Sequence, residues 1–246
     1  MQAVCLVIPC YNEGERLDLP EIAEFLKRFG DYHFCFVDDG SDDRTDSILR
    51  SFTNDWPDRT TLFSYRDNCG KAEAVRRGMR TALDWKEFDF IGYLDADLST
   101  PLREMHRLTG ILQSGSEVLL VMGSRVRRLG AEISRNPVRH YLGRVFATVS
   151  GLMMPVKAYD TQCGAKIFRR ELVAPIFGEP FVSKWFFDLE ILKRIASQID
   201  HPARVILEVP LNKWVEKGDS KIGFADFLRA PIELVRIYKH YAGQST

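Results

Sequence analysis

The sequence predicts an α/β fold, a single domain built around a mainly parallel sheet. The first half of the chain alternates short apolar runs with amphipathic helical patterns, which is typical of βαβ units. Polar clusters follow several of the apolar runs, at the strand ends where such sheets bind ligands. With 246 residues, 45% of them hydrophobic, the chain can bury one sizeable core.

Five short apolar runs in the first half are the predicted strands. Each is too short for a helix of ordinary length and is followed by polar or turn-forming residues. We expect them to form the central sheet. They are Val4–Ile8, His33–Val37, Thr61–Ser64, Phe90–Leu94 and Val118–Met122.

Helices are predicted where apolar residues recur three and four positions apart, as on one face of an amphipathic helix. Pro20 and Pro101 suit the first turns of two of these helices. The two clearest stripes are Ile22, Phe25, Leu26 and Phe29, and Met105, Leu108, Ile111 and Leu112.

The second half is less regular, and we expect it to complete one side of the ligand-binding site. The pattern predicts a helix from about Pro137 to Leu152, a turn over Asp160–Lys166, a helix over Asp188–Ser197 and an amphipathic stretch from Phe224 to Tyr241. No linker or repeat divides the chain. We therefore assign residues 1–222 to a catalytic domain and 223–246 to a C-terminal amphipathic helical segment of the same domain.

Composition excludes several classes of protein. The 34 basic and 34 acidic residues cancel, and no Lys/Arg block resembles a nucleic-acid footprint, so we expect no nucleic-acid partner. The five cysteines show no CxxC spacing and suggest reduced, cytosolic thiols. No apolar stretch approaches the roughly 18 residues of a transmembrane helix, and the apolar run at the N-terminus is too short for a signal peptide. We expect a cytoplasmic protein.

The pair Asp95 and Asp97 directly follows the predicted strand Phe90–Leu94. Two carboxylates at a strand end can hold Mg²⁺ or Mn²⁺ against a diphosphate, because these ions prefer oxygen ligands. An isolated Asp-x-Asp is also compatible with a helix cap or a turn with solvated carboxylates.

A second acidic loop, Asp38–Thr45, follows the predicted strand His33–Val37. Adjacent like charges at Asp38 and Asp39 are costly unless a ligand uses them, and such carboxylates can accept hydrogen bonds from a base or a ribose. For Asp42–Thr45 we favour helix capping.

Two basic residues are candidate phosphate ligands. Lys71 follows Gly70 at the start of a helical pattern, where an ammonium and free backbone N–H groups can face a phosphate. Arg125 follows the small pair Gly123 and Ser124, and its planar fork suits bidentate phosphate binding. The alternative for Lys71 is a solvated lysine at a helix start.

Several motifs in order resemble glycosyltransferase family two. Within it they are most similar to the polyprenyl-phosphate sugar transferases, above all the dolichyl-phosphate β-glucosyltransferases. The resemblance covers about residues 4 to 221. This chain departs from the pattern at Ala72, where relatives often have a second glycine. The motifs are Ile8–Glu13, Val37–Thr45, Asn68–Lys71, Asp95–Pro101, Gly123–Arg125 and Asp160–Gly164.

The resemblance implies a GT-A type nucleotide-sugar-binding fold and a role for each matched residue. Asp95 and Asp97 would hold the metal, Mg²⁺ or Mn²⁺. Arg125, with Arg139 or else Arg135, would hold an acceptor phosphate. Asp97, Arg125 and Asp188 are the expected catalytic residues, Asp188 either orienting an arginine or acting as a base. The expected nucleotide-sugar ligands are Pro9, Tyr11, Asn12, Glu13, Asp38, Asp39, Lys71 and Asp95.

The expected reaction is inverting transfer of a hexose, most simply glucose from UDP-glucose, to a polyprenyl phosphate. One alternative is a family-two enzyme that glycosylates a saccharide hydroxyl with Asp188 or Asp160 as base. The other is a nucleotide-binding module without transfer activity. A lipid acceptor requires access to the bilayer, so we expect peripheral association with the cytoplasmic face through the basic amphipathic segment Phe224–Tyr241, or packing of that segment on the catalytic domain.

Overall fold

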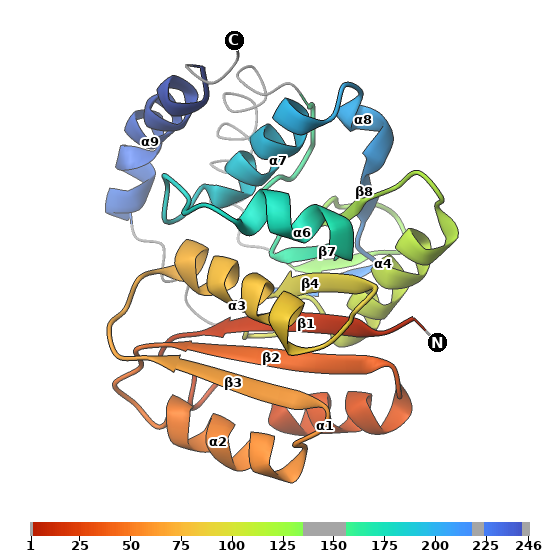
Figure 1. The fold of residues 1–246 in the computed structure, drawn as a ribbon, viewed down its shortest axis with the longest axis vertical. Coiled ribbons are helices and arrows are strands. Elements are labelled where there is room, and N and C mark those ends of the chain that lie inside the picture. Colours follow the sequence, from red (N-terminus) through yellow and green to blue (C-terminus); the bar gives the residue numbers. More distant parts are fainter. Residues whose placement is uncertain (1, 135–155, 218–223, 243–246) are drawn as a thin grey trace.

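A computed structural model describes residues 2–134, 156–217 and 224–242. Within them a seven-stranded sheet has the order β3-β2-β1-β4-β7-β5-β8, and a small second sheet pairs β6 with β9 (Figure 1). Strand β7 runs antiparallel to both neighbours, β4 and β5, whereas the other pairs of the large sheet are parallel. The predicted α/β fold with a mainly parallel sheet is confirmed.

All five predicted strands are present. The described residues also form strands that the sequence did not predict, namely β6, β7, β8 and β9. Ala165 and Lys166, which we expected in a turn, begin β7, because pairing with β4 and β5 extends the chain there. The large sheet contains β1 (Val4–Cys10), β2 (Tyr32–Asp39), β3 (Thr60–Tyr65), β4 (Phe90–Leu94), β5 (Leu120–Ser124), β7 (Ala165–Arg169) and β8 (Ile206–Pro210). The small sheet contains β6 (Glu132–Ser134) and β9 (Lys213–Val215).

The helices also follow the sequence pattern closely. Pro20 lies in the first turn of α1 as predicted, and Asp18 caps that helix by accepting the Glu21 N–H at 3.0 Å. Pro101 instead occupies the position before α4, with an extended backbone, so its expected first-turn place was wrong by one residue. The helix expected at 137–152 lies outside the described residues. The described helices are α1 (Leu19–Arg28), α2 (Thr45–Asp55), α3 (Lys71–Trp85), α4 (Leu102–Ser114), α6 (Arg170–Phe177), α7 (Phe187–Gln198), α8 (Pro202–Val205) and α9 (Phe224–Ala242).

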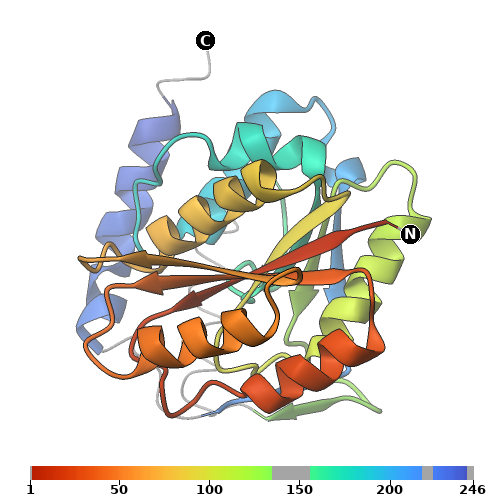
Figure 2. The same cartoon turned by 60° about the horizontal axis from the view of Figure 1, so that its bottom comes forward.

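The sheet is buried on both faces, as parallel sheets usually are. Successive residues of β1 enter opposite core layers: Leu6 packs with residues of α1, α2 and α4, and Val7 with residues of α3, α6 and α7. Figure 2 shows α1 and α2 on one side of the sheet and α3 on the other. Gly78 lets α3 approach closely, since a Cβ there would lie 2.3 Å from Val7 Cγ1.

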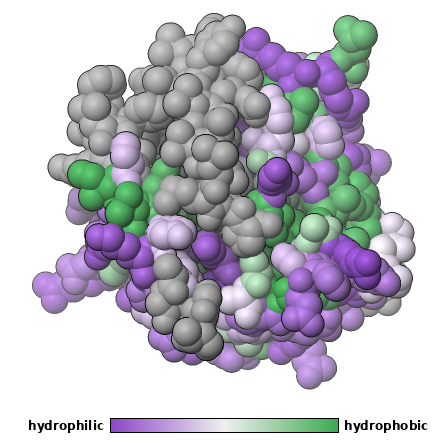
Figure 3. All heavy atoms as spheres, turned by 90° about the horizontal axis from the view of Figure 1, so that it is seen from above, coloured by the Kyte–Doolittle hydropathy of each residue, from purple (hydrophilic) through white to green (hydrophobic). Residues whose placement is uncertain are grey.

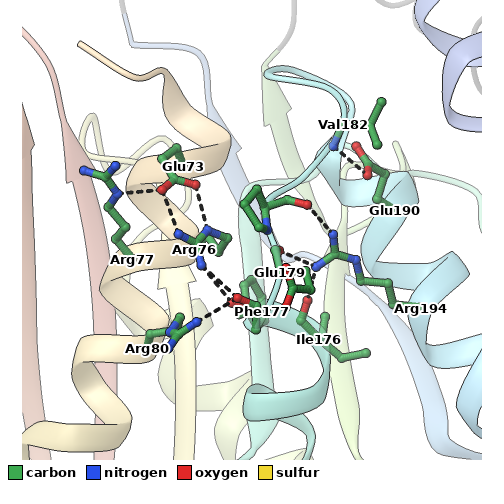
Figure 4. Close-up of polar contacts among 12 residues, drawn as sticks. Glu73, Arg76, Arg77, Arg80, Ile176, Phe177, Glu179, Val182, Glu190 and Arg194 are labelled. Atoms are coloured by element: carbon green, nitrogen blue, oxygen red, sulfur yellow. Dashed lines mark hydrogen bonds and ion pairs between the residues drawn. The ribbon is translucent and has the colours of Figure 1, made fainter. Parts of the chain in front are cut away.

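Buried charges on α7 anchor the segment between α6 and α7 (Figure 4). Arg194 donates to the carbonyls of Ile176, Glu179 and Pro180, each at 2.7 Å. The Glu190 carboxylate accepts the N–H groups of Val182 and Ser183 at 2.9 and 2.7 Å. Both charged side chains have hydrogen-bond partners, and a buried charge with such partners costs less free energy than an unpaired one.

Helix α9 packs on this framework through one face. Leu234 and Ile237 are buried, and the Tyr241 hydroxyl donates to Glu190 and accepts from Arg194 Nε, both at 2.9 Å. Pro231 lies inside the helix and does not begin it.

Among the described residues no helix is long and apolar enough to cross a membrane. No disulfide joins any of the five cysteines.

Candidate active site

The predicted polar clusters meet at one edge of the sheet. Strands β1, β2 and β4 are parallel neighbours, so the loops that follow them leave the sheet on the same side. Pairing of Leu94 with Ala165 brings the 160–164 loop to that edge as well, because β7 runs in the opposite direction. The topology therefore assembles one site from four separated segments.

Hydrogen bonds tie the loop after β1 to the loop after β2. The Asn12 N–H donates to Ser41 Oγ at 2.9 Å, and Asn12 Oδ1 accepts the Asp42 N–H at 2.9 Å. The Glu13 N–H donates to Thr45 Oγ1 at 2.8 Å. Asn12 has a φ of 50°, a left-handed conformation that asparagine tolerates. Asn12 and Glu13, which we expected to bind the nucleotide sugar, thus hold the loop after β1 against the loop after β2.

Asp38 and Asp39, adjacent at the end of β2, have different surroundings. Asp38 is 3% exposed and accepts the Ser41 hydroxyl, and burial raises its pKa. Asp39 accepts the N–H groups of Cys69 and Gly70 at 3.0 and 2.7 Å, and burial raises its pKa too. We expected both to bind the nucleotide; the protein itself supplies donors to both Asp39 oxygens, so Asp39 positions the loop that starts α3.

Lys71, Asp95 and Asp97 form the charged centre of the edge. Lys71 Nζ lies 2.5 Å from Asp95 Oδ1, and Asp97 Oδ1 accepts the Ser99 N–H at 2.8 Å. Burial and the nearby Asp95 raise the pKa of Asp97. Burial alone would lower the pKa of Lys71, but the carboxylates, Asp95 foremost, outweigh it and raise that pKa. The charges of the two aspartates therefore influence each other.

The donor set suits a cation that also binds phosphate. Within the described part of the chain no group of three or more His, Cys, Asp or Glu residues surrounds a cation position. Mg²⁺ typically takes one or two carboxylates and completes its shell with water and phosphate oxygens. Asp95 Oδ1 is buried and accepts no hydrogen bond from the described residues beyond its ion pair with Lys71. Asp95 and Asp97 thus fit Mg²⁺ or Mn²⁺ bound together with a diphosphate.

Arg125 is held by a partner that the sequence did not reveal. Its Nε and Nη2 donate to the two Asp160 oxygens, each at 2.7 Å, and its N–H donates to Asp160 at 3.0 Å. Glu208 on β8 in turn accepts the Asp160 N–H at 2.8 Å. The Nε–Nη2 edge of the guanidinium is therefore occupied by Asp160. Arg139, the second expected phosphate ligand, lies outside the described residues.

Asp188 lies in the core rather than beside an arginine. It is 4% exposed, and its Oδ1 accepts the Tyr93 hydroxyl and Lys166 Nζ, the latter at 2.5 Å. Lys166, fully buried, also donates to the carbonyls of Thr161 and Cys163 at 2.9 and 2.7 Å. Asp188 therefore acts on the 160–164 loop through Lys166. A lysine amid the apolar residues of β7 was the one sequence signal for this link.

Similarity to known proteins agrees with this geometry. A family model described as glycosyl transferase family 2 matches residues 5–177. A dolichyl-phosphate beta-glucosyltransferase of Trichomonas vaginalis, ALG5C, is 31% identical over 94% of this chain and 69% of its own. Enzymes of the same name from Dictyostelium discoideum and Homo sapiens are 29% and 28% identical, each over 96% of this chain and over 74% and 75% of their own length.

Solved structures share the fold. A glucosyl-3-phosphoglycerate synthase from Mycobacterium tuberculosis, in complex with Mn²⁺, uridine-diphosphate and phosphoglyceric acid, superposes with a TM-score of 0.71 over 96% of this chain and 78% of that one, at 16% identity. The same enzyme with Mg²⁺ and uridine-diphosphate gives a TM-score of 0.70 at 18% identity, covering 97% and 80%. With its GT-A type sheet and the motif loops at one edge, the chain belongs to glycosyl transferase family 2.

Proposed function

We propose that this protein transfers glucose from UDP-glucose to a polyprenyl phosphate with inversion at the anomeric carbon. The names of the relatives supply the sugar and the lipid phosphate. The observation that carries the proposal is the cluster of Lys71, Asp95 and Asp97 at the end of β4, whose charges suit a diphosphate with a divalent cation. Uridine-diphosphate in the neighbouring structures supports the choice of nucleotide.

The donor half of the site is assigned to the loops after β1, β2 and β4. Pro9, Tyr11, Asn12, Glu13 and Asp38 would line the nucleoside. Lys71 would contact the diphosphate, and Asp95 and Asp97 would hold Mg²⁺ or Mn²⁺, which when bound neutralises charge on the departing UDP.

The acceptor half needs positioning more than proton transfer. A phosphate monoester has a second pKa near 6 and is largely ionised at neutral pH. Its oxygen attacks the anomeric carbon, the bond to UDP breaks, and the charge passes to the diphosphate. Arg125 and Arg139 would hold the acceptor phosphate.

A saccharide hydroxyl as acceptor would need a carboxylate base. Both candidates are already committed: Asp160 pairs with Arg125, and Asp188 is buried against Lys166. This favours a phosphate over a hydroxyl as the acceptor. Arg125 and Asp188 would then assist the transfer without either of them acting as a base. A nucleotide-binding module without activity would have no use for the Asp95 and Asp97 pair.

The test is a transfer assay with UDP-glucose and Mn²⁺, comparing a short polyprenyl phosphate with a panel of sugars. We expect product from the lipid phosphate alone, in the β-configuration. An α-linked product would exclude inversion, glycosylated sugars would favour the hydroxyl acceptor, and the absence of transfer and of UDP-glucose hydrolysis would favour the binding module. We further propose that the enzyme works at the cytoplasmic face of a membrane, where its acceptor is anchored.

A further inference from the structure

We propose that Lys71 is a displaceable internal counterion: it occupies the cation-binding oxygen of Asp95 until a diphosphate draws it away, so that the divalent cation binds well only with the nucleotide. This inference rests on the proposed use of a nucleotide diphosphate and a cation. It concerns the order of binding, which the proposed function leaves open.

The position of the Lys71 ammonium is the first observation. Nζ lies 2.5 Å from Asp95 Oδ1, and beyond this ion pair that oxygen accepts no hydrogen bond from the described residues. The side chains of Lys71 and Asp95 are 31% and 38% exposed, although Oδ1 itself is buried, so solvent contacts other atoms of the pair. An ammonium and a divalent cation cannot both occupy this short contact.

The Asp95 carboxylate is the fixed partner of the pair. It lies against Gly164, where an added Cβ would be 2.1 Å from Oδ2 and 2.4 Å from Cγ. The 160–164 loop is in turn held by Lys166 through the carbonyls of Thr161 and Cys163. Lys71 has a flexible four-carbon stem, so it is the partner that moves.

Charge balance explains why Lys71 stays until a ligand replaces it. Without a cation, Lys71 offsets the adjacent negative charges of Asp95 and Asp97. A divalent cation that arrives alone must expel the ammonium, which then loses its carboxylate. A diphosphate supplies the expelled ammonium with new oxygens near the start of α3. Cation and nucleotide therefore bind with positive coupling, and by linkage each tightens the other by the same factor.

The experiment measures Mn²⁺ affinity of the full chain by calorimetry, with and without UDP, in the wild type and Lys71→Met. A matched control is Lys184→Met, because the Lys184 stem packs 3.4 Å from the Cβ position of Gly70 but no described carboxylate forms an ion pair with it. Without UDP we expect Lys71→Met to bind Mn²⁺ about tenfold more tightly than wild type, within the usual range of coupling. Lys184→Met should change it less than about twofold, since an exposed charge acts weakly.

With UDP present, the advantage of Lys71→Met should disappear, because wild-type Lys71 then has a phosphate partner. Unchanged or weaker Mn²⁺ binding by Lys71→Met without UDP would overturn the inference, as would equal tightening by the two variants. If wild type binds no Mn²⁺ even with UDP, the inference and the metal assignment both fall, while the transfer assay still decides the reaction. Matched melting temperatures exclude misfolding as the cause.

Discussion

At the scale of single residues, the carboxylates at the sheet edge differ in whether the protein or a ligand supplies their hydrogen-bond donors. Asp39 and Asp160 have protein donors on both oxygens and build the site. Asp38 and Asp97 accept fewer hydrogen bonds from the protein, and burial raises the pKa of both. The sequence placed Asp38, Asp39, Asp95 and Asp97 at the strand ends, because strand ends follow from apolar runs, whereas Asp160 was predicted only to lie in a turn. It could not separate the two classes, because the partners of Asp39 and Asp160 lie about 30 or more residues away.

Asp97→Asn should reduce glucosyl transfer by at least about 100-fold, equivalent to about 2.7 kcal/mol of barrier. The substitution halves the charge offered to the cation and creates no cavity. Asp84→Asn, on an exposed position of α3, makes the same chemical change away from the edge and should leave the rate unaltered. Initial rates of the two variants check this, and an Asp97→Asn rate within threefold of wild type would exclude the metal role.

Gly164→Ala should disable the site through Asp95. The new Cβ would overlap the Asp95 carboxylate at 2.1 Å, and overpacking of a tight site costs about 1–3 kcal/mol. We expect loss of Mn²⁺-dependent UDP binding together with a lower melting temperature. The matched control is Gly110→Ala in α4, where nothing lies within 4 Å of the added Cβ and helix propensity should make the protein slightly more stable. If Gly164→Ala binds UDP and Mn²⁺ normally, the close contact does not fix Asp95.

At the scale of elements, periodicity was enough for five strands of the large sheet and for helices such as α1 and α4, but not for β7 or for the short strands β6, β8 and β9. The five predicted strands are apolar runs, and α1 and α4 carry clear stripes. In β7 a charged residue, Lys166, is fully buried, and its burial is explained by two nearby carbonyls and by the carboxylate of Asp188, 22 residues later. The insertion of β7 between β4 and β5 is likewise a long-range pairing that no local pattern encodes.

Strand β2 carries a histidine that should make stability depend on pH. His33 packs against Trp85 and Phe88, and its Nδ1 is buried without a hydrogen bond from the described residues. Burial, then Lys86 and Arg59, lower its pKa to about 4, against a smaller opposing effect of the backbone at Asp31 and Val4. The unfolded chain therefore binds the proton more readily, and His33 costs stability as pH falls from 6.5 towards 4.

Urea denaturation at pH 7 and pH 5 measures this cost. Between these values His33 should account for about 1–2 kcal/mol of lost stability, and His33→Leu should remove that part of the pH dependence. Carboxylates titrate equally in both proteins, so the difference between their slopes isolates the histidine. Identical pH dependence in the two proteins would show that His33 is protonated in the native state as easily as in the unfolded one.

At the scale of the whole molecule, α9 joins the catalytic domain on one face and presents apolar residues on the other. Tyr241 is tied to Glu190 and Arg194, which also hold the segment leading into α7. Ile232 and Val235 on the other side are 68% and 48% exposed, and Tyr238, at the flank of the packed face, is 48% exposed and contacts Lys193 of α7. Arg236 and Lys239 lie on the same helix, and Figure 3 shows apolar and strongly hydrophilic residues side by side on this side of the molecule. The sequence left two alternatives for this helix, packing on the catalytic domain and contact with a membrane. One face of α9 does pack on the domain, and the exposed apolar residues leave a surface that could contact a membrane.

The double variant Ile232→Ser/Val235→Ser should bind anionic vesicles several-fold more weakly than wild type in flotation, because burial of exposed apolar area contributes to interfacial binding of a basic amphipathic helix. A surface variant is preferable to a chain ending at Gly223, since that truncation removes Tyr241, one of the hydrogen-bond partners of buried Glu190 and Arg194. Phe63→Ser, on edge strand β3 and 37% exposed in wild type, removes apolar area elsewhere and should float like wild type. Added salt should weaken binding of all three proteins by screening the basic residues. Equal flotation of the double variant and wild type would exclude this face of α9 as the membrane contact.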